Sequence, residues 1–333
     1  MRMKKTNRLY RCLLPLVWLT FLLSSCIKED YAGSTDETAT VNLVFSTRAD
    51  GQGTADVDEN EGIKTLRVLI TDADGKVEIN TVQNFNDVPE TTLTILGVPV
   101  GTKNFYVIAN EASVGLTDLD DVGTVDEDFL NRVITNPSDA PYFPKTRSQI
   151  STSGLPITGM KEGVQVKGGE NQQIEIEIVH AVAKVVLYVD NQSGEPFTLQ
   201  QVNFGPFIAD RTYLFDKSQQ LPDGVQFNEM PLNAENVEVT PDKDEAVFTG
   251  YIYETGSQDI SDFTLSLVSN TKGFEALATP VTIHFDEAGR NYINRNDQVE
   301  ICAIVNIHKE VETDLDILVV PWGEKDIDVP PFS

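Results

Sequence analysis

The strongest constraint on the fold is an alternation of apolar and polar residues over short segments, which recurs along most of the chain. Val41, Leu43 and Phe45 alternate with polar or smaller residues, and IEIEIV at 174–179 has the same period. A period of two is typical of a β-strand with one buried face. Further segments with strand character are KTLRVLITDADGKVEINTV, TTLTILGVPVGTKNFYVIAN, AKVVLYVDNQSGEPFTLQQVNF, EAVFTGYIYE, DFTLSLVSN, TPVTIHF and DQVEICAIVNIH.

Turn residues separate these segments at short intervals. DADG at 72–75 predicts a β-hairpin, and a Pro/Gly pair joins the two strands of TTLTILGVPVGTKNFYVIAN. Short strands with turn signals at this spacing favour β-sandwich modules over a parallel α/β fold. The best helix candidate is short, at 126–135. The sequence therefore predicts an all-β chain.

The length of 333 residues suggests about two domains. We place the boundary near residue 179, where the alternating strand 172–179 meets HAVAKVVLYV. The expected N-terminal β-sandwich domain is 49–179 and the C-terminal β-sandwich domain is 180–333. Two acidic segments, 49–62 and 117–128, are predicted to be solvated loops.

The N-terminus predicts export. Residues 1–25 read as a signal peptide, because five basic residues precede the apolar run 12–23, which is too short for a good transmembrane helix. The run ends in LSSC, the pattern of a bacterial lipoprotein signal, so Cys26 is the expected lipid-attachment residue. The alternative is an ordinary signal peptide followed by a chance cysteine.

Charge and cysteine content exclude several classes. The formal net charge of −27 repels nucleic acid and anionic headgroups, so we expect no nucleic-acid partner. Cys12 leaves with the signal and Cys26 is expected to be acylated. Cys302 then has no partner for a disulfide and is predicted to be a buried or half-buried strand residue.

No sequence pattern indicates a catalytic, cofactor or metal site. Asp72, Asp74 and Gly75 resemble the start of a calcium loop, but Gln83 stands where the bidentate acid is needed, so a hairpin turn is the better interpretation. The three histidines lie far apart, with no metal-ligand spacing. Nucleophile-elbow and phosphate-loop motifs are missing, and no carboxylate pair can be chosen for glycoside hydrolysis. The three histidines are His180, His284 and His308. From these observations together we expect a protein that is not an enzyme.

Arg48 is the only Lys or Arg between Lys28 and Lys64, and it follows a strand and precedes a segment with little apolar content. An exposed basic residue there suits an arginine-specific protease, although a chance arginine in a loop is the alternative. Cleavage of the bond to Ala49 would separate the body from its lipid. It would also free the strand that contains Val41, Leu43 and Phe45 and expose unpaired strand edges.

The C-terminus continues the alternation with Leu315, Ile317 and Val319, and then with Ile327 and Val329. Such a segment could add as a strand to another molecule, and head-to-tail addition builds a filament. The two prolines 330–331 would end the added strand. The alternative, that the segment pairs within its own domain, stays open.

Together these motifs resemble the fimbrillin family, the type V pilin subunits of Bacteroidales. The matching segments are LSSC with IKEDY, NLVFSTR, RVLITDADGKV, GLPITGM, HAVAKVVLYV, YIYE, INRNDQVEICAIV and VVPWGEKDI. The resemblance implies two tandem transthyretin-like Greek-key domains and a lipoprotein precursor in the outer membrane. It also implies a propeptide of 26–48 that is cut at Arg48–Ala49, a donor strand from about 323–333, and polymerisation with copies of itself or related pilins.

Other classes stay open from the sequence. An anchor subunit would keep its lipid and its first strand, and a tip subunit would accept a donor strand without supplying one. A monomeric surface lipoprotein that binds glycans would need an exposed aromatic platform. Trp18 lies in the signal and Trp322 in the C-terminal segment, so such a platform would depend on the nine tyrosines.

Overall fold

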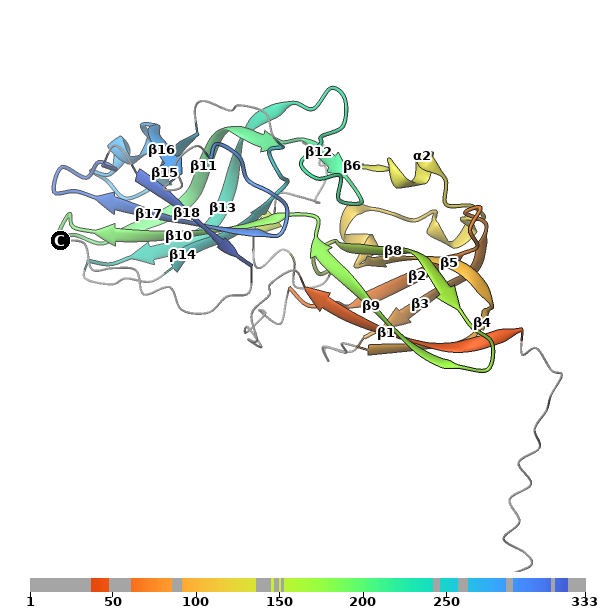
Figure 1. Cartoon of the computed structure of the whole chain (residues 1–333). Coiled ribbons are helices and arrows are strands. Elements are labelled where there is room, and N and C mark those ends of the chain that lie inside the picture. Colours follow the sequence, from red (N-terminus) through yellow and green to blue (C-terminus); the bar gives the residue numbers. More distant parts are fainter. Residues whose placement is uncertain are drawn as a thin grey trace, which may run out of the picture. The chain divides into compact units, whose positions relative to one another are not determined.

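The computed structural model describes residues 37–47, 61–85, 92–135, 145–146, 150, 153–241, 246–256, 263–285, 290–312 and 315–322 (Figure 1). Within these residues the chain consists of strands and a few short helical turns. The predicted all-β architecture, with two β-rich sandwich-like domains, is confirmed. No helix in the described ranges has both the length and the apolar character needed to cross a membrane.

Seven strands form the first sheet, in the order β3-β2-β5-β8-β9-β1-β4. Neighbouring strands run antiparallel except β1 and β9, which run parallel. Alternate side chains of these strands form one buried apolar core. The strands are β1 (Thr38–Thr47), β2 (Thr65–Thr71), β3 (Val77–Asn84), β4 (Thr92–Pro99), β5 (Gly101–Ala109), β8 (Ile157–Val166) and β9 (Asn171–His180).

The predicted hairpin joins β2 to β3. The Asp72 side chain accepts hydrogen bonds from the backbone N–H groups of Asp74 and Lys76, at 3.0 and 2.9 Å. Gly75 has φ +82°, and a Cβ atom there would lie 2.4 Å from the carbonyl oxygen of Val125. The aspartate and the glycine therefore serve the turn, as the hairpin interpretation predicts.

The acidic segment 117–128 is not the solvated loop that the sequence predicts. It contains η2 (Leu119–Asp121), and Leu119 and Val125 are buried in a second apolar cluster. Asp120 accepts a hydrogen bond from the buried guanidinium of Arg67 at 2.7 Å. Apolar residues between the charges fasten this segment to the protein, which a count of charges alone does not indicate.

The helix predicted at 126–135 is only partly present. It is the single turn α2 (Glu127–Leu130), which Asp126 caps by accepting from the backbone N–H of Phe129 at 3.0 Å. The chain then forms the short strand β6 (Val133–Thr135), which pairs with β12 (Arg211–Tyr213). Three consecutive residues of β6 are β-branched, which favours extended backbone over a longer helix.

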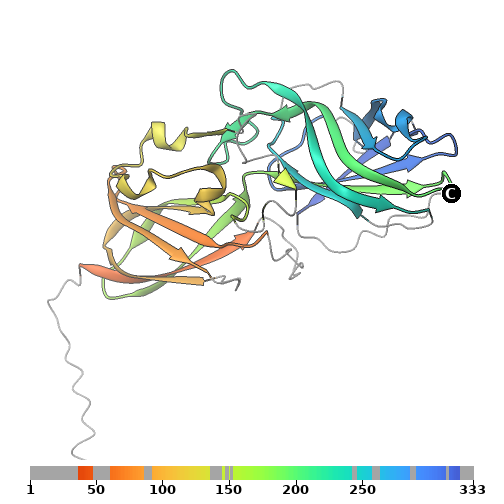
Figure 2. The ribbon, with the colours of Figure 1, turned by 180° about the vertical axis from the view of Figure 1, so that it is seen from behind.

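Nine strands form the second sheet, in the order β13-β11-β15-β16-β18-β17-β10-β14-β7. Its core is a separate apolar cluster. Figure 2 shows the long strands β11 and β13 curving across this sheet. The strands are β7 (Lys145–Thr146), β10 (Ala183–Asn191), β11 (Phe197–Ala209), β13 (Phe227–Val239), β14 (Ala246–Ile252), β15 (Thr264–Ser269), β16 (Val281–Phe285), β17 (Asp297–Val305) and β18 (Leu315–Pro321).

The two sheets share one three-strand arrangement. In the first, β1 runs parallel to β9 and antiparallel to β4; in the second, β10 runs parallel to β17 and antiparallel to β14. Ala39, Val41 and Leu43 of β1 are buried, as are the equivalent Ala183, Val185 and Leu187 of β10. The sequence does not reveal this repeat because the surrounding strands differ in length and connection.

The strands of the first sheet end at His180 and those of the second begin at Ala183, apart from β7, which pairs with β14. The second apolar cluster is separate from the two sheet cores and contains Tyr106 of β5, Tyr251 of β14 and Trp322, which follows β18. Residues on both sides of position 180 therefore contribute to one buried apolar cluster.

Candidate assembly site

β1 is an inner strand of the first sheet (Figure 1). Its residues 40–47 pair in parallel with residues 171–178 of β9, and its other edge pairs with β4. Val41 and Leu43 are fully buried and Phe45 is 8% exposed. These are the three residues that the sequence assigns to a removable strand, and the structure places all three in the core of the first sheet.

The opposite face of β1 makes polar contacts with both neighbouring strands. The Asn42 side chain donates to Oδ1 of Asn171 on β9 and accepts from the hydroxyl of Thr94 on β4, each at 2.7 Å. Because Asn42 is bonded across both edges, it fixes the register of β1 in addition to the backbone ladder.

We call the site that β1 occupies between β9 and β4 its seat, and this site would be unstable if it were empty. Burying one large apolar side chain is worth about 1.5–3 kcal/mol, so Val41, Leu43 and Phe45 together contribute several kcal/mol. Removing the strand would also leave unpaired backbone groups on β9 and β4. An empty seat would therefore favour insertion of another strand with alternating apolar residues.

Several residues assigned from the sequence lie outside the described residues. They are Cys26, Arg48 and Ala49 on the N-terminal side, and Ile327 and Val329 at the C-terminus. The described part of β1 ends at Thr47, directly before Arg48.

The first part of the alternating C-terminal segment pairs within its own sheet. Leu315–Pro321 is β18, which lies between β16, to which it is parallel, and β17, to which it is antiparallel. Ile317 is fully buried in the core of that sheet. Of the two readings left open by the sequence, the structure supports pairing within the domain for residues 315–321.

Sequence reasoning missed a buried carboxylate, that of Glu61, which is 1% exposed. Glu61 Oε1 accepts from the Tyr251 hydroxyl at 2.6 Å and lies 2.7 Å from Nζ of Lys184, and Oε2 accepts from Nε1 of Trp322 at 3.2 Å. The Trp322 ring also stacks on His180. These residues are far apart in the sequence, and none has a local motif that could have signalled the cluster.

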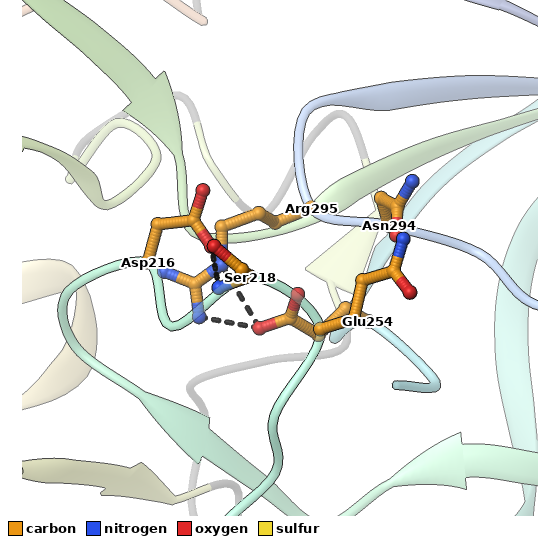
Figure 3. Close-up of a pocket in the computed structure, with 6 residues that line it drawn as sticks. Asp216, Ser218, Glu254, Asn294 and Arg295 are labelled. Atoms are coloured by element: carbon orange, nitrogen blue, oxygen red, sulfur yellow. Dashed lines mark hydrogen bonds and ion pairs between the residues drawn. The ribbon is translucent and has the colours of Figure 1, made fainter. Parts of the chain in front are cut away.

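A polar cavity of about 190 Å³ lies beside a second buried ion pair (Figure 3). Glu254 Oε1 accepts from Nε and Nη2 of Arg295, at 2.9 and 2.5 Å, and also from the hydroxyl of Thr212 at 2.7 Å. The same guanidinium donates to the carbonyl oxygen of Tyr213 at 2.8 Å. The pair therefore ties the strand 211–213 to the segment after β14 and to the segment before β17. None of the six residues that line the cavity is aromatic.

The histidines and the cysteine do not form a chemical centre in the described part of the chain. His180 is buried, whereas His284 of β16 and His308 are exposed, and Cys302 of β17 is half-buried. Burial lowers the pKa of His180 below its ordinary value because it disfavours the imidazolium form. Among the described residues, no group of three or more His, Cys, Asp or Glu side chains is placed to hold a metal ion.

Residues 39–178 match the family model described as the major fimbrial subunit protein, FimA. Over these residues the chain is similar to the major fimbrial subunit family. The match begins in β1 and ends in β9, so it covers the seven-stranded sheet described above. The members of this family are structural subunits of fimbriae and not enzymes.

Solved structures share the fold of this chain over most of its length. A candidate cell adhesion protein from Parabacteroides distasonis matches with a TM-score of 0.56 and 16% identity, over 86% of this chain and 98% of its own. The fimbrilin FimA from Porphyromonas gingivalis matches with a TM-score of 0.55 and 14% identity, over 88% and 100%. The C-terminally truncated tip fimbrial protein Mfa3 from Porphyromonas gingivalis matches with a TM-score of 0.55 and 12% identity, over 85% and 99%. No curated protein matches the chain significantly.

Proposed function

We propose that this fimbrial subunit is a polymerising structural component of a surface pilus that serves adhesion. It is exported as a lipoprotein acylated at Cys26 and held on the outer membrane. An arginine-specific protease then cuts after Arg48, and β1 leaves its seat. The C-terminal segment of another subunit, with Ile327 and Val329, fills the seat by donor-strand exchange.

The single observation that carries the proposal is the position of β1. It is an inner strand with three buried apolar side chains, and its last residue, Thr47, directly precedes Arg48. One cut at Arg48 would therefore convert a continuous part of the chain into a separate strand. The removal of that strand would leave a long apolar groove with two hydrogen-bonding edges.

The donor segment has the pattern that such a groove needs. Ile327 and Val329 stand two positions apart, so both side chains of an extended segment point to the same face. Charged residues Asp326 and Asp328 alternate with them and would face water. The seat and the segment belong to opposite ends of the chain, so their pairing between molecules would be heterologous and would extend as a filament.

The first test is the N-terminal residue and the intact mass of the protein sheared from the bacterial surface. A chain that starts at Ala49 and carries no lipid supports the proposal. A chain that starts at acylated Cys26 overturns cleavage and indicates an anchor subunit or a monomeric lipoprotein that keeps β1.

A second test separates cleavage from polymerisation. The purified chain is treated with an arginine-specific protease and run on a gel without boiling, beside Arg48→Lys, which keeps the charge but removes the cleavage site. Ladders are expected only from the chain with Arg48. A double variant with Ile327→Glu and Val329→Glu should be cut normally but form no ladder, because charged side chains do not fit apolar pockets. A ladder from the double variant would exclude this donor segment.

A further inference from the structure

The Glu61 carboxylate, at 1% exposed, is the most completely buried acidic group in the described part of the chain. A carboxylate removed from water is stable only when donors or cations compensate for its lost hydration. Here a phenol, an ammonium group and an indole N–H surround it at 2.6, 2.7 and 3.2 Å. Tyr251 and Lys184 contact Oε1 and Trp322 contacts Oε2, so both oxygen atoms of the buried carboxylate have a partner.

The donors all come from the part of the chain that follows the first sheet. Lys184 is in β10, Tyr251 is in β14, and Trp322 directly follows β18. Trp322 is in turn held by His180, and the backbone N–H of His180 donates to Oδ1 of Asn296 at 3.1 Å. Glu61 is therefore held by strands of the second sheet, although it leads into the first.

The residues after Glu61 are held as well. Oδ1 of Asn110 accepts from the backbone N–H groups of Lys64 and Thr65, at 2.8 and 3.2 Å. Nδ2 of the same side chain donates to the carbonyl oxygens of Gly62 and Leu155, at 3.1 and 2.7 Å. The segment 61–65 is thus fixed at its start by Glu61 and at its end, where β2 begins, by Asn110.

We propose that Glu61 is an anchoring residue that keeps segment 61–65 attached to the second sheet after β1 has left. It also fixes Trp322, the residue from which the C-terminal segment departs. The proposal rests on the proposed function for its purpose, because cleavage after Arg48 makes residue 49 the new N-terminus only 12 residues before Glu61. The anchor stops the loss of β1 from continuing into β2, and it fixes the point where the donor segment leaves its own subunit.

The chain provides its own optical probe for this site. It has two tryptophans, and Trp18 lies in the predicted signal peptide, so Trp322 is the only one in the exported chain. Trp322 is 5% exposed. Its emission wavelength and its quenching by acrylamide therefore report whether Trp322 remains buried beside Glu61.

The test compares Glu61→Ala, Glu61→Gln and Tyr251→Phe with Glu312→Gln, a control at an exposed carboxylate. Tryptophan emission, acrylamide quenching and cleavage at the Lys64–Thr65 bond by a lysine-specific protease are measured before and after treatment with an arginine-specific protease. Intact mass identifies each cut. Tyr251→Phe removes one hydroxyl and keeps the ring, so it remains informative if the larger changes prevent folding.

After the Arg48 cut, the original chain and Glu312→Gln should keep the blue-shifted emission of a buried tryptophan. Their Lys64–Thr65 bond should stay resistant to the lysine-specific protease. In Glu61→Ala, we expect red-shifted emission and cleavage at Lys64 that is about tenfold faster or more, as the loss of a charge-assisted hydrogen bond predicts. Buried emission and an intact Lys64–Thr65 bond in Glu61→Ala would overturn the proposal. Tryptophan emission and cleavage at Lys64 are measured without polymerisation. A chain that fails to polymerise can therefore still show whether Glu61 anchors the segment.

Discussion

The indole ring of Trp322 lies flat against the imidazole ring of His180, with ring centroids 3.9 Å apart and an interplanar angle of 11°. His180 is the last residue of β9, so the stack joins the final strand of the first sheet to the residue after β18. Nδ1 of His180 faces Oδ1 of Asn296 at 3.1 Å. The imidazole is therefore fixed on one face and at one nitrogen.

This burial predicts a dependence of stability on pH. The pKa of His180 is lowered in the folded protein, chiefly by burial, and Glu61 and Lys184 are the charged groups that face it. At pH values above the ordinary histidine pKa of about 6.5, the ring is neutral in both states. As the pH falls below that value, the unfolded chain takes up a proton that the folded protein resists, so stability is lost.

The measurement is the free energy of urea unfolding between pH 7.5 and pH 5.5, values of roughly one unit on either side of the ordinary pKa. We expect the decrease over this range to become smaller in His180→Phe, which keeps a flat ring without a titrating nitrogen. His308→Asn, at an exposed position, should leave the decrease unchanged. Equal decreases in the original chain and in His180→Phe would contradict the prediction.

Leu43 and Leu187 offer a matched pair for testing the release of β1. Both are fully buried and occupy equivalent positions: Leu43 faces Ile174 in parallel pairing, and Leu187 faces Ile301. Before cleavage, replacement of either leucine by alanine should lower the free energy of unfolding by about 2–5 kcal/mol. If cleavage at Arg48 releases β1 as proposed, Leu43 leaves with it, and only Leu187→Ala should still destabilise the rest of the chain. A persistent effect of Leu43→Ala would mean that the cut strand stays bound.

The hairpin glycine Gly75 should tolerate no side chain. Gly75→Ala forces an L-residue to φ +82° and brings its Cβ to 2.4 Å from the Val125 carbonyl oxygen. The expected loss of unfolding free energy is roughly 2–5 kcal/mol, from left-handed strain and overpacking together. Gly163→Ala is the control, since its φ is +68° but no heavy atom lies within 4 Å of its Cβ. It should cost about 1–2 kcal/mol. Equal losses in urea unfolding would exclude the Val125 contact as the cause.

The ion pair of Glu254 and Arg295 should be sensitive to the loss of one partner. Both side chains are 2% exposed, so Glu254→Ala leaves an unpaired buried guanidinium and should cost about 3–5 kcal/mol. The double variant Glu254→Leu with Arg295→Met should recover much of that loss, because apolar side chains of similar volume need no partner. Differential scanning calorimetry of the single and double variants measures this coupling. If the double variant loses as much stability as the two single changes together, the predicted coupling is wrong.

The sequence predicts best what depends on neighbouring residues. The turn at Asp72–Gly75 is predictable because both residues that make it lie within the turn itself. The strand character of β1 and β10 follows from their alternation. By contrast, the interpretation of 117–128 as a solvated loop is wrong because Leu119 is buried and Arg67, 53 residues before Asp120, pairs with that aspartate.

The buried polar cluster around Glu61 could not be predicted for the same physical reason. Its partner Tyr251 is 190 positions away and Trp322 is 261 positions away. An acidic residue at the end of the segment 49–62 has the composition of a solvated loop. Only the fold brings three donors to it. The same holds for Arg295, whose partners Glu254 and Thr212 are 41 and 83 positions away.

The equivalence of β1 and β10 has a consequence for the geometry of growth. β10 is continuous with β9 before it and with β11 after it, so no single cut can detach it from its parallel partner β17. A single cut can therefore release β1 from the first sheet but cannot release β10 from the second. In the assembly proposed above, each subunit offers one acceptor groove and one donor strand. The filaments are therefore directional and unbranched, and a filament stops growing at a subunit that lacks the groove or the donor strand.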